Sequence, residues 1–533
     1  MSAPQSTIYI CSGVRLNSRY EHSIYFASAS AQASYFAGKV VKTYAAYTFL
    51  RKSWPLKVEA TMAQAKAWSY LYFQNGGSGK VYYYFINNIE YINDHTVELT
   101  LELDVLQTYM FDYTLLPSFV ERQHVEDDTP GKHTQEEGLD PGEYQVEAAY
   151  DVTDMNTLCI MVLASITLNG DSAETTVSAY GSMYNFVFSG LKLYAIPLSN
   201  WSTWSRQLDN LSEWGKVDGI VAMWMYPQNL VSLGGEQTWT DSDLTKVVNG
   251  AKAIYFDVPM AQSGAIDGYT PKNNKLYCYP YNFMYATNHN GGSAVYRYER
   301  FPTGYDVAHF MITGALAPDT GARLTPINQY NGADTYTEGL TLGSFPSCAW
   351  DADGYKIWIA QNQNQHDLTM TSGTIKAAVG GISAVGSLLT GNLMGAAGGA
   401  GMAYSGFMDV QQLIAAREDK AVEPPQARGT FSSNLNVANM KHNFGILRKT
   451  VTAEYARRID DFFTMYGYRI NQVKTPNRHA RQGFTYVKTV GCHIAANLCN
   501  EDTVKIESIY DHGVTWWTDG DSIGDYSQAN NTI

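Results

Sequence analysis

Hydrophobic and polar residues alternate most strictly in residues 96–105. Val97, Leu99 and Leu101 belong to a series of apolar residues at every second position, and the residues between them are Thr, Glu or Asp. A period of two over this length is typical of a β-strand with one buried face. The opposite face is acidic, and we expect it to be either a solvated edge or an anionic wall.

The clearest hairpin joins two aromatic stretches, residues 70–73 and 81–86, through the glycine-rich residues 76–79. The turn superficially resembles a phosphate-binding loop. That motif requires Gly at the position of Gln74 and Ser or Thr at the position of Val81. We therefore predict a turn with no role in nucleotide binding.

Further short elements follow from periodicity. The predicted strands and helices lie, in chain order, at 28–37 (helix), 40–58 (strand), 62–67 (helix), 451–465 (helix) and 468–473 (strand). The turn-rich residues 121–147 contain acidic pairs that we expect to be exposed, and they are predicted to form a linker and boundary. The resulting fold class is mainly β with short helices, a β-rich multidomain α+β protein.

One long stretch departs from this pattern. Residues 377–408 contain no charge and many glycines, and Gly391, Gly395 and Gly399 form a tandem G-x-x-x-G ladder. The stretch exceeds the roughly 20 residues that cross a bilayer as a helix. Glycine disfavours such a helix in water. Two interpretations follow: a Gly/Ala loop or hairpin buried in a large core, or a membrane-active segment.

Composition narrows the class of protein. At 533 residues with 45% hydrophobic and 17% charged residues, the chain should fold into two to four domains. The net charge of −14 argues against gripping nucleic acid through phosphates, although it is compatible with a channel through which DNA slides. The six cysteines form no C-x-x-C pair, so free buried thiols are expected.

Candidate chemistry is sparse. Neither H-E-x-x-H nor G-x-S-x-G occurs, so we expect no catalytic residues, no metal site and no cofactor. Trp201, Trp204 and Trp214 are interpreted as aromatic core rather than a carbohydrate platform. Residues 441–488 are locally basic and could bind phosphate or pair with an acidic neighbouring subunit, of which we favour the subunit contact; the candidate residues are Arg457, Arg458, Arg469, Lys474, Arg478 and Arg481.

Several collinear motifs point to a known family. They are residues 104–111 (D-V-L-Q-T-Y-M-F), 118–125 (S-F-V-E-R-Q-H-V), 454–487 (E-Y-x-R-R, F-F-x-x-Y-G-Y-x-I-N-x-V-K-x-P-N-x-x-x-R and F-x-Y-V, in order), 509–517 (I-Y-D-H-G-V-T-x-W) and 523–527 (I-G-x-Y-S). In sequence and order these motifs closely resemble the distal tail tube, or tail knob, proteins of small short-tailed bacteriophages of the Picovirinae type. The terminal thirds match well, whereas the middle matches only in short pieces such as residues 279–281.

The resemblance implies a domain plan. It predicts an N-terminal tube domain at 1–150, outer knob domains at 151–345, a polar collar with the apolar loop at 346–430, and a C-terminal tube domain at 431–533. Both tube domains would be β-barrel-like.

The resemblance also implies a role. The chain would form a homohexameric conduit in the distal tail whose acidic wall lets DNA pass without specific binding. Six apolar loops would plug the conduit and later enter the host membrane as a pore. The loop residues expected to insert are Ile382, Val385, Leu388, Leu389, Gly391, Leu393, Met394, Gly395, Gly399, Met402, Tyr404, Phe407 and Met408.

Other expected partners are the upper tail or collar (nozzle) protein, the host membrane and a tail-tip cell-wall hydrolase. The alternative function is a receptor-binding or glycan-degrading tail component with its site in the Trp-rich middle.

Overall fold

The computed structural model consists of two compact units. Unit 1 contains residues 1–144, 262–281 and 451–533, and unit 2 contains residues 145–261 and 282–450. The structure describes residues 6–47, 55–76, 78–164, 168, 182–184, 187–188, 192–213, 220–235, 237–239, 245–260, 264–301, 307–316, 320–327, 339–342, 347–349, 430–432 and 443–533.

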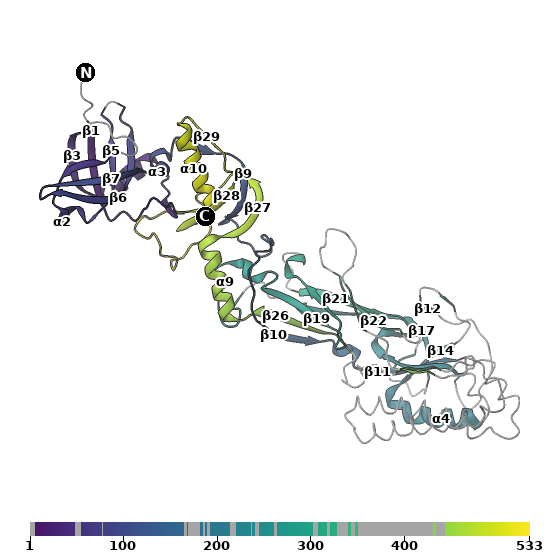
Figure 1. The fold of residues 1–533 in the computed structure, drawn as a ribbon. Helices are drawn as coiled ribbons and strands as arrows, with labels where there is room; N and C mark the ends of the chain where they lie inside the picture. Colours follow the sequence, from purple (N-terminus) through teal and green to yellow (C-terminus); the bar gives the residue numbers. More distant parts are fainter. Residues whose placement is uncertain are drawn as a thin grey trace, which may run out of the picture. The chain divides into compact units, whose positions relative to one another are not determined.

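Unit 1 is built on two sheets (Figure 1). The six-stranded sheet has the order β3-β1-β5-β6-β7-β4, with strands β1 (Ser6–Ser12), β3 (Val40–Tyr47), β4 (Leu56–Glu59), β5 (Trp68–Gln74), β6 (Val81–Asn93) and β7 (Thr96–Leu103). The five-stranded sheet has the order β2-β30-β28-β9-β27, with strands β2 (His22–Ile24), β9 (Ser118–Gln123), β27 (Tyr468–Lys474), β28 (Phe484–Val490) and β30 (Val514–Trp517).

Short helices and one small strand pair complete unit 1. These elements are α1 (Ala29–Ala37), α2 (Met62–Ala65), α3 (Val105–Tyr109), β8 (Tyr113–Leu115), η5 (Asn274–Tyr277), α9 (Ala453–Tyr466), β29 (Ile494–Ala496) and α10 (Asn500–His512). One hydrophobic core joins the six-stranded sheet to Phe484, Trp516 and Trp517. Strands from the two ends of the chain therefore share both a sheet and a core, which the sequence analysis had not anticipated.

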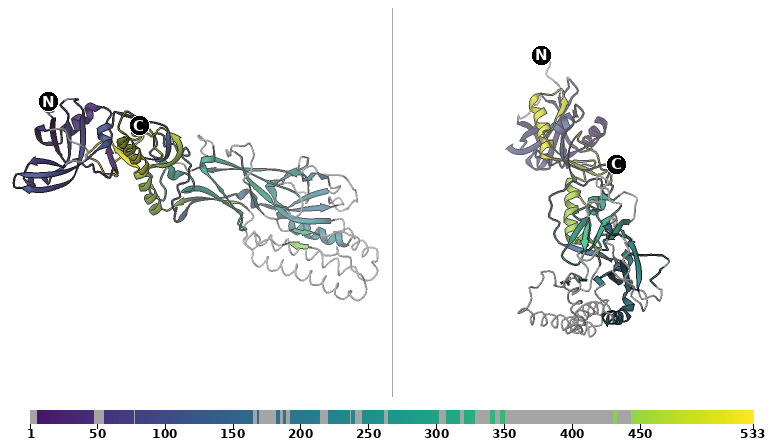
Figure 2. Two further views of the ribbon diagram at one scale, coloured as in Figure 1. Left: turned by 45° about the horizontal axis from the view of Figure 1, so that its top comes forward. Right: turned by 90° about the vertical axis from the view of Figure 1, so that its right-hand side faces the viewer.

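Unit 2 is also β-rich. Its seven-stranded sheet has the order β16-β17-β14-β11-β15-β24-β25, with strands β11 (Leu158–Ala164), β14 (Lys192–Pro197), β15 (Ile220–Pro227), β16 (Val231–Leu233), β17 (Lys246–Ala251), β24 (Ser347–Ala349) and β25 (Thr430–Ser432). Helix α4 (Trp201–Glu213) packs against one face of this sheet, where Trp204 is buried (Figure 2). For Trp204 the prediction of an aromatic core is therefore confirmed.

Two four-stranded sheets and a small hairpin complete the described part of unit 2. The first sheet has the order β10-β26-β19-β20, with strands β10 (Tyr144–Asp151), β19 (Asn282–Thr287), β20 (Ser293–Tyr296) and β26 (Gly445–Val451). The second has the order β18-β21-β22-β23, with strands β18 (Ile254–Pro259), β21 (Val307–Gly314), β22 (Ala322–Pro326) and β23 (Leu340–Leu342). The hairpin pairs β12 (Ser182–Tyr184) with β13 (Val187–Phe188).

Most of the predicted elements in the described residues are confirmed. Alternating residues of β7 are buried, and β5 pairs with β6 from Gln74 to Val81 across the glycine turn. The fold class, β-rich with few short helices, is confirmed. The single strand expected over 40–58 is wrong, because β3 and β4 are separate and lie at opposite ends of the strand order.

Two further expectations are corrected by burial. Within residues 121–147, Glu137 is buried inside unit 1 and forms ion pairs there, so the expected exposure is wrong for Glu137, whereas Asp127 and Glu136 are exposed. The two units divide between Tyr144 and Gln145, within this range. Of the cysteines whose side chains are described, Cys11, Cys159, Cys278 and Cys492 form no disulfide and are buried as predicted, whereas Cys499 is exposed.

Candidate functional site

The stretch that contains the uncharged residues 377–408 is joined to unit 2 through two paired strands. Strand β24 pairs with β25, and the last residue of the former, Ala349, is the register partner of the first residue of the latter, Thr430. Strand β24 also pairs with β15, so both strands extend the end of the seven-stranded sheet. Residues 350–429 thus leave the sheet and return to it at adjacent positions.

The predicted membrane-inserting residues lie within this excursion. All of them, from Ile382 to Met408, fall outside the described residues. Within the parts that the structure describes, no helix is both long enough and apolar enough to cross a membrane. The described strands therefore fix where the excursion starts and ends.

The acidic face of β7 is partly neutralised within unit 1. Lys57 Nζ lies 3.5 Å from a carboxylate oxygen of Glu98, which faces it across the strand pair. Glu102 accepts hydrogen bonds from Lys505 Nζ and Asn87 Nδ2, both at 2.8 Å. The wall predicted from the sequence therefore carries less net charge than its carboxylates alone suggest.

The six candidate basic residues do not form one surface patch. Arg457 and Arg458 are exposed on α9, and Arg458 pairs with Glu454 of the same helix. Lys474, at the end of β27, is partly exposed, and Arg469 of the same strand donates to the Glu136 carbonyl at 3.0 Å.

The other two arginines are engaged inside the unit. Arg481 is 5% exposed and lies 3.4 Å from Asp128. The Arg478 guanidinium lies 5.3 Å from the ring centroid of Tyr113 and 5.5 Å from that of Trp516. A subunit-contact role stays a prediction for the exposed members of the set.

Three carboxylates hold residues 264–281, the segment of unit 1 that lies between two strands of unit 2 in the sequence. Asp460, on the buried side of α9, accepts from the Lys272 backbone N–H at 2.7 Å and from Asn273 Nδ2 at 2.8 Å. Burial raises the pKa of Asp460. Asp128 accepts from the Asn274 backbone N–H at 3.2 Å.

The third carboxylate is the most enclosed. The Glu137 side chain is fully buried and forms ion pairs with Arg122 and with Lys275, whose side chain is 2% exposed. It also accepts from the Arg469 backbone N–H at 2.9 Å. Burial lowers the pKa of Lys275, and the Glu137 charge opposes that shift.

Asp128 and Glu137 belong to the acidic pairs expected to be exposed, which is wrong for Glu137, and the burial of Asp460 was not expected although one signal was available. Asp460 lies four residues after Ala456 and three before Phe463, so helical periodicity places it among buried residues. A charged residue at such a position is expected to have a specific partner. Nothing comparable marked Glu137, which lies in an irregular segment.

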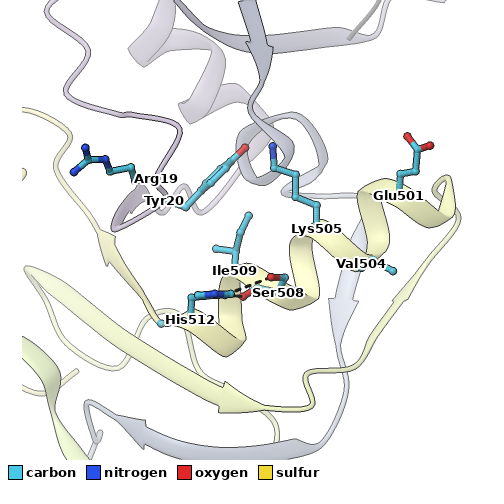
Figure 3. Close-up of a pocket in the computed structure, with 9 residues that line it drawn as sticks. Arg19, Tyr20, Glu501, Val504, Lys505, Ser508, Ile509 and His512 are labelled. Atoms are coloured by element: carbon cyan, nitrogen blue, oxygen red, sulfur yellow. Dashed lines mark hydrogen bonds between the residues drawn. The ribbon is translucent and has the colours of Figure 1, made fainter. Parts of the chain in front are cut away.

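A shallow cavity of about 420 Å³ lies between α10 and the turn at Arg19–Tyr20, which comes just before β2 in the sequence (Figure 3). Lys505 on its wall is paired with Glu102, and His512 Nδ1 lies 2.7 Å from the Ser508 carbonyl oxygen. The Ser508 hydroxyl lies 3.3 Å from His512 Nδ1, one turn apart on α10. No group of metal-ligating side chains occurs among the residues that the structure describes.

Comparison with known proteins identifies the kind of molecule. Residues 247–531 match the family model for the C-terminal domain of the Bacillus phage phi29 tail knob protein gp9, and residues 4–114 match the N-terminus of the caudoviral major tail proteins. The tail knob proteins gp9 of Bacillus phages B103 and phi29 are 28% and 26% identical to this chain, over 98% of both chains in each case.

A solved structure supports the same fold. The structural alignment with the tail knob protein gp12 of bacteriophage C1 covers 99% of this chain and 100% of the gp12 chain, with a TM-score of 0.65 at 13% sequence identity. The relatives are named as structural components of the tail, in keeping with a non-enzymatic role. The chain therefore belongs to the phi29-type tail knob protein family and is a structural component of the tail of a short-tailed bacteriophage.

Proposed function

We propose that this chain forms a homohexameric distal tail tube and knob through which DNA leaves the virion. Residues 377–408 of each copy close the conduit before infection and then enter the host membrane as a pore. Further partners in this proposal are the upper tail protein, the DNA in transit and a cell-wall hydrolase at the tail tip.

The pairing of β24 with β25 is the observation that supports the proposal. Because Ala349 and Thr430 are register partners, the two ends of residues 350–429 join neighbouring strands of one sheet. The uncharged, glycine-rich part of this stretch is costly to expose in water and well suited to close helix contact in lipid.

Membrane activity can be tested with vesicles. Residues 377–408 are replaced by a Gly/Ser linker of equal length, and release of an encapsulated dye is compared with that caused by the unmodified chain. We expect the unmodified chain to release dye and the replacement to abolish release. Equal release from both proteins would overturn the membrane role of this segment.

The oligomeric state of both proteins is measured separately, as a control. Native mass spectrometry of both proteins should give the mass of six copies of the 59.2 kDa chain. A hexamer that does not release dye would attribute the loss to the segment itself. A monomeric unmodified chain would contradict the conduit.

A further inference from the structure

An exposed apolar row crosses three strands of the five-stranded sheet in unit 1. Phe119 of β9 is the register partner of Val473 in β27 and also of Val490 in β28, so the three side chains share one face of the sheet. Their exposed fractions are 39%, 71% and 56%. The row is therefore contiguous, in contrast to apolar residues scattered singly over a surface.

The row lies beside a sheet edge. Strand β27 is last in the strand order, so its side facing away from β9 has no strand neighbour among the described residues. A salt bridge of 2.7 Å between Lys488 and Glu121 lies on β28 and β9 next to the row, whereas Lys474, which follows Val473 on β27, lies on the opposite face of the sheet. An apolar edge of this kind invites association with another chain unless it is covered.

A second exposed apolar site is flanked by acidic residues. The end of the hairpin between β6 and β7 carries Tyr91 and Ile92, which are 57% and 44% exposed, between the exposed carboxylates of Glu90 and Asp94. The hairpin end lies next to α2, because the Ala60 N–H donates to the His95 carbonyl at 3.0 Å. Within unit 1, α2 and β27 are on opposite sides (Figure 1).

We propose that the row Phe119–Val473–Val490 of one copy of this chain contacts the β6–β7 hairpin end of the next copy. A ring with more than two subunits needs two different, mutually complementary surfaces on each subunit. Here both surfaces are apolar at the centre, and they lie on opposite sides of unit 1, as the two contact surfaces of one subunit in a ring do. This inference rests on the proposed assembly and names its contact.

The first test is Val473→Glu in the full chain, with Val504→Glu as the matched control. Val504 is 53% exposed on α10 and lies on neither surface. We expect the Val473 variant to raise the concentration needed for assembly at least about ten-fold, as loss of a central interface residue does. The Val504 variant should assemble like the unmodified chain, and thermal unfolding should show that both fold.

A second test locates the partner surface. In a Cys499→Ser background, which removes an exposed thiol, the double variant Val473→Cys and Ile92→Cys should form disulfide-linked multimers on mild oxidation. Pairing Val473→Cys with Val504→Cys should yield only unlinked chains.

The outcomes separate this inference from the proposed assembly. If the unmodified chain assembles and Val473→Glu assembles equally well, the contact named here is wrong and the ring stands. If the double cysteine variant assembles but stays unlinked, the hairpin end is not the partner surface. A monomeric unmodified chain would overturn both.

Discussion

Glu137 shows how one side chain can hold together segments that are far apart in the sequence. Its carboxylate joins Arg122 on β9, Lys275 in the segment between two strands of unit 2, and the backbone of Arg469 on β27. Removing one partner of such a buried group leaves the remaining charges without compensation. Residues 264–281 are therefore expected to depend on this carboxylate for their attachment.

Glu137→Gln should lower the free energy of unfolding of unit 1 by about 3–5 kcal/mol, because it breaks a buried ion pair. Denaturant unfolding followed by tryptophan fluorescence measures this difference. The exposed neighbour is the control, and Glu136→Gln should change stability by less than about 0.5 kcal/mol. A loss below about 1 kcal/mol for Glu137→Gln would show that the carboxylate is not the anchor described here.

His124 makes the same unit sensitive to acid. Its Nδ1 accepts from the Tyr486 backbone N–H at 2.7 Å, and its Nε2 lies 3.0 Å from the Thr464 carbonyl. Burial, assisted by the nearby Arg481 charge, lowers the pKa of His124 from 6.5 to about 3. In the unfolded chain the His124 imidazole is therefore protonated below pH 6.5, whereas in the folded chain it is protonated only near pH 3 and below.

It follows that the free energy of unfolding should decrease as the pH falls from 6.5 towards 3, by about 2 kcal/mol between pH 6.5 and 5 from this residue. In His124→Asn, whose amide oxygen can still accept from Tyr486, this part of the pH dependence should disappear. Thermal unfolding at a series of pH values measures it, with exposed His95→Asn as the control. An unchanged pH dependence in His124→Asn would refute the assignment.

At the scale of single elements, local pattern was a good guide. The alternation in β7 and the apolar side of α9 both appear as predicted, with Leu99 and Phe463 fully buried. A period reports which face of an element is buried but not which element covers it. Hence the burial of Arg481 against Asp128, from segments far apart in the sequence, could not be predicted.

The glycine ladder is the element on which membrane insertion depends. If residues 377–408 form helices in lipid, Gly395→Leu should block their close approach and reduce dye release about ten-fold. Gly401→Leu is the matched control, since Gly401 lies on roughly the opposite side of such a helix from Gly399. Equal release from the two variants would exclude the ladder from the mechanism.

At the scale of the whole molecule, the two ends of the chain build one unit. Strands β2 and β9 from the first part of the chain share a sheet with β27, β28 and β30 from its end. Most of the sequence motifs that resemble the family lie in these same segments. The family could therefore be inferred from the sequence, although the pairing of the strands could not. Pairing between distant strands depends on tertiary contacts that no local sequence pattern specifies.

The central claim is that the assembled chain opens a pore by releasing residues 377–408. The most direct test is the electrical conductance of a planar lipid bilayer exposed to the purified hexamer. The account predicts discrete conductance steps with the unmodified protein and none when these residues are replaced by a Gly/Ser linker of equal length. Steps that persist in the linker variant, or their absence from the unmodified protein, would contradict it.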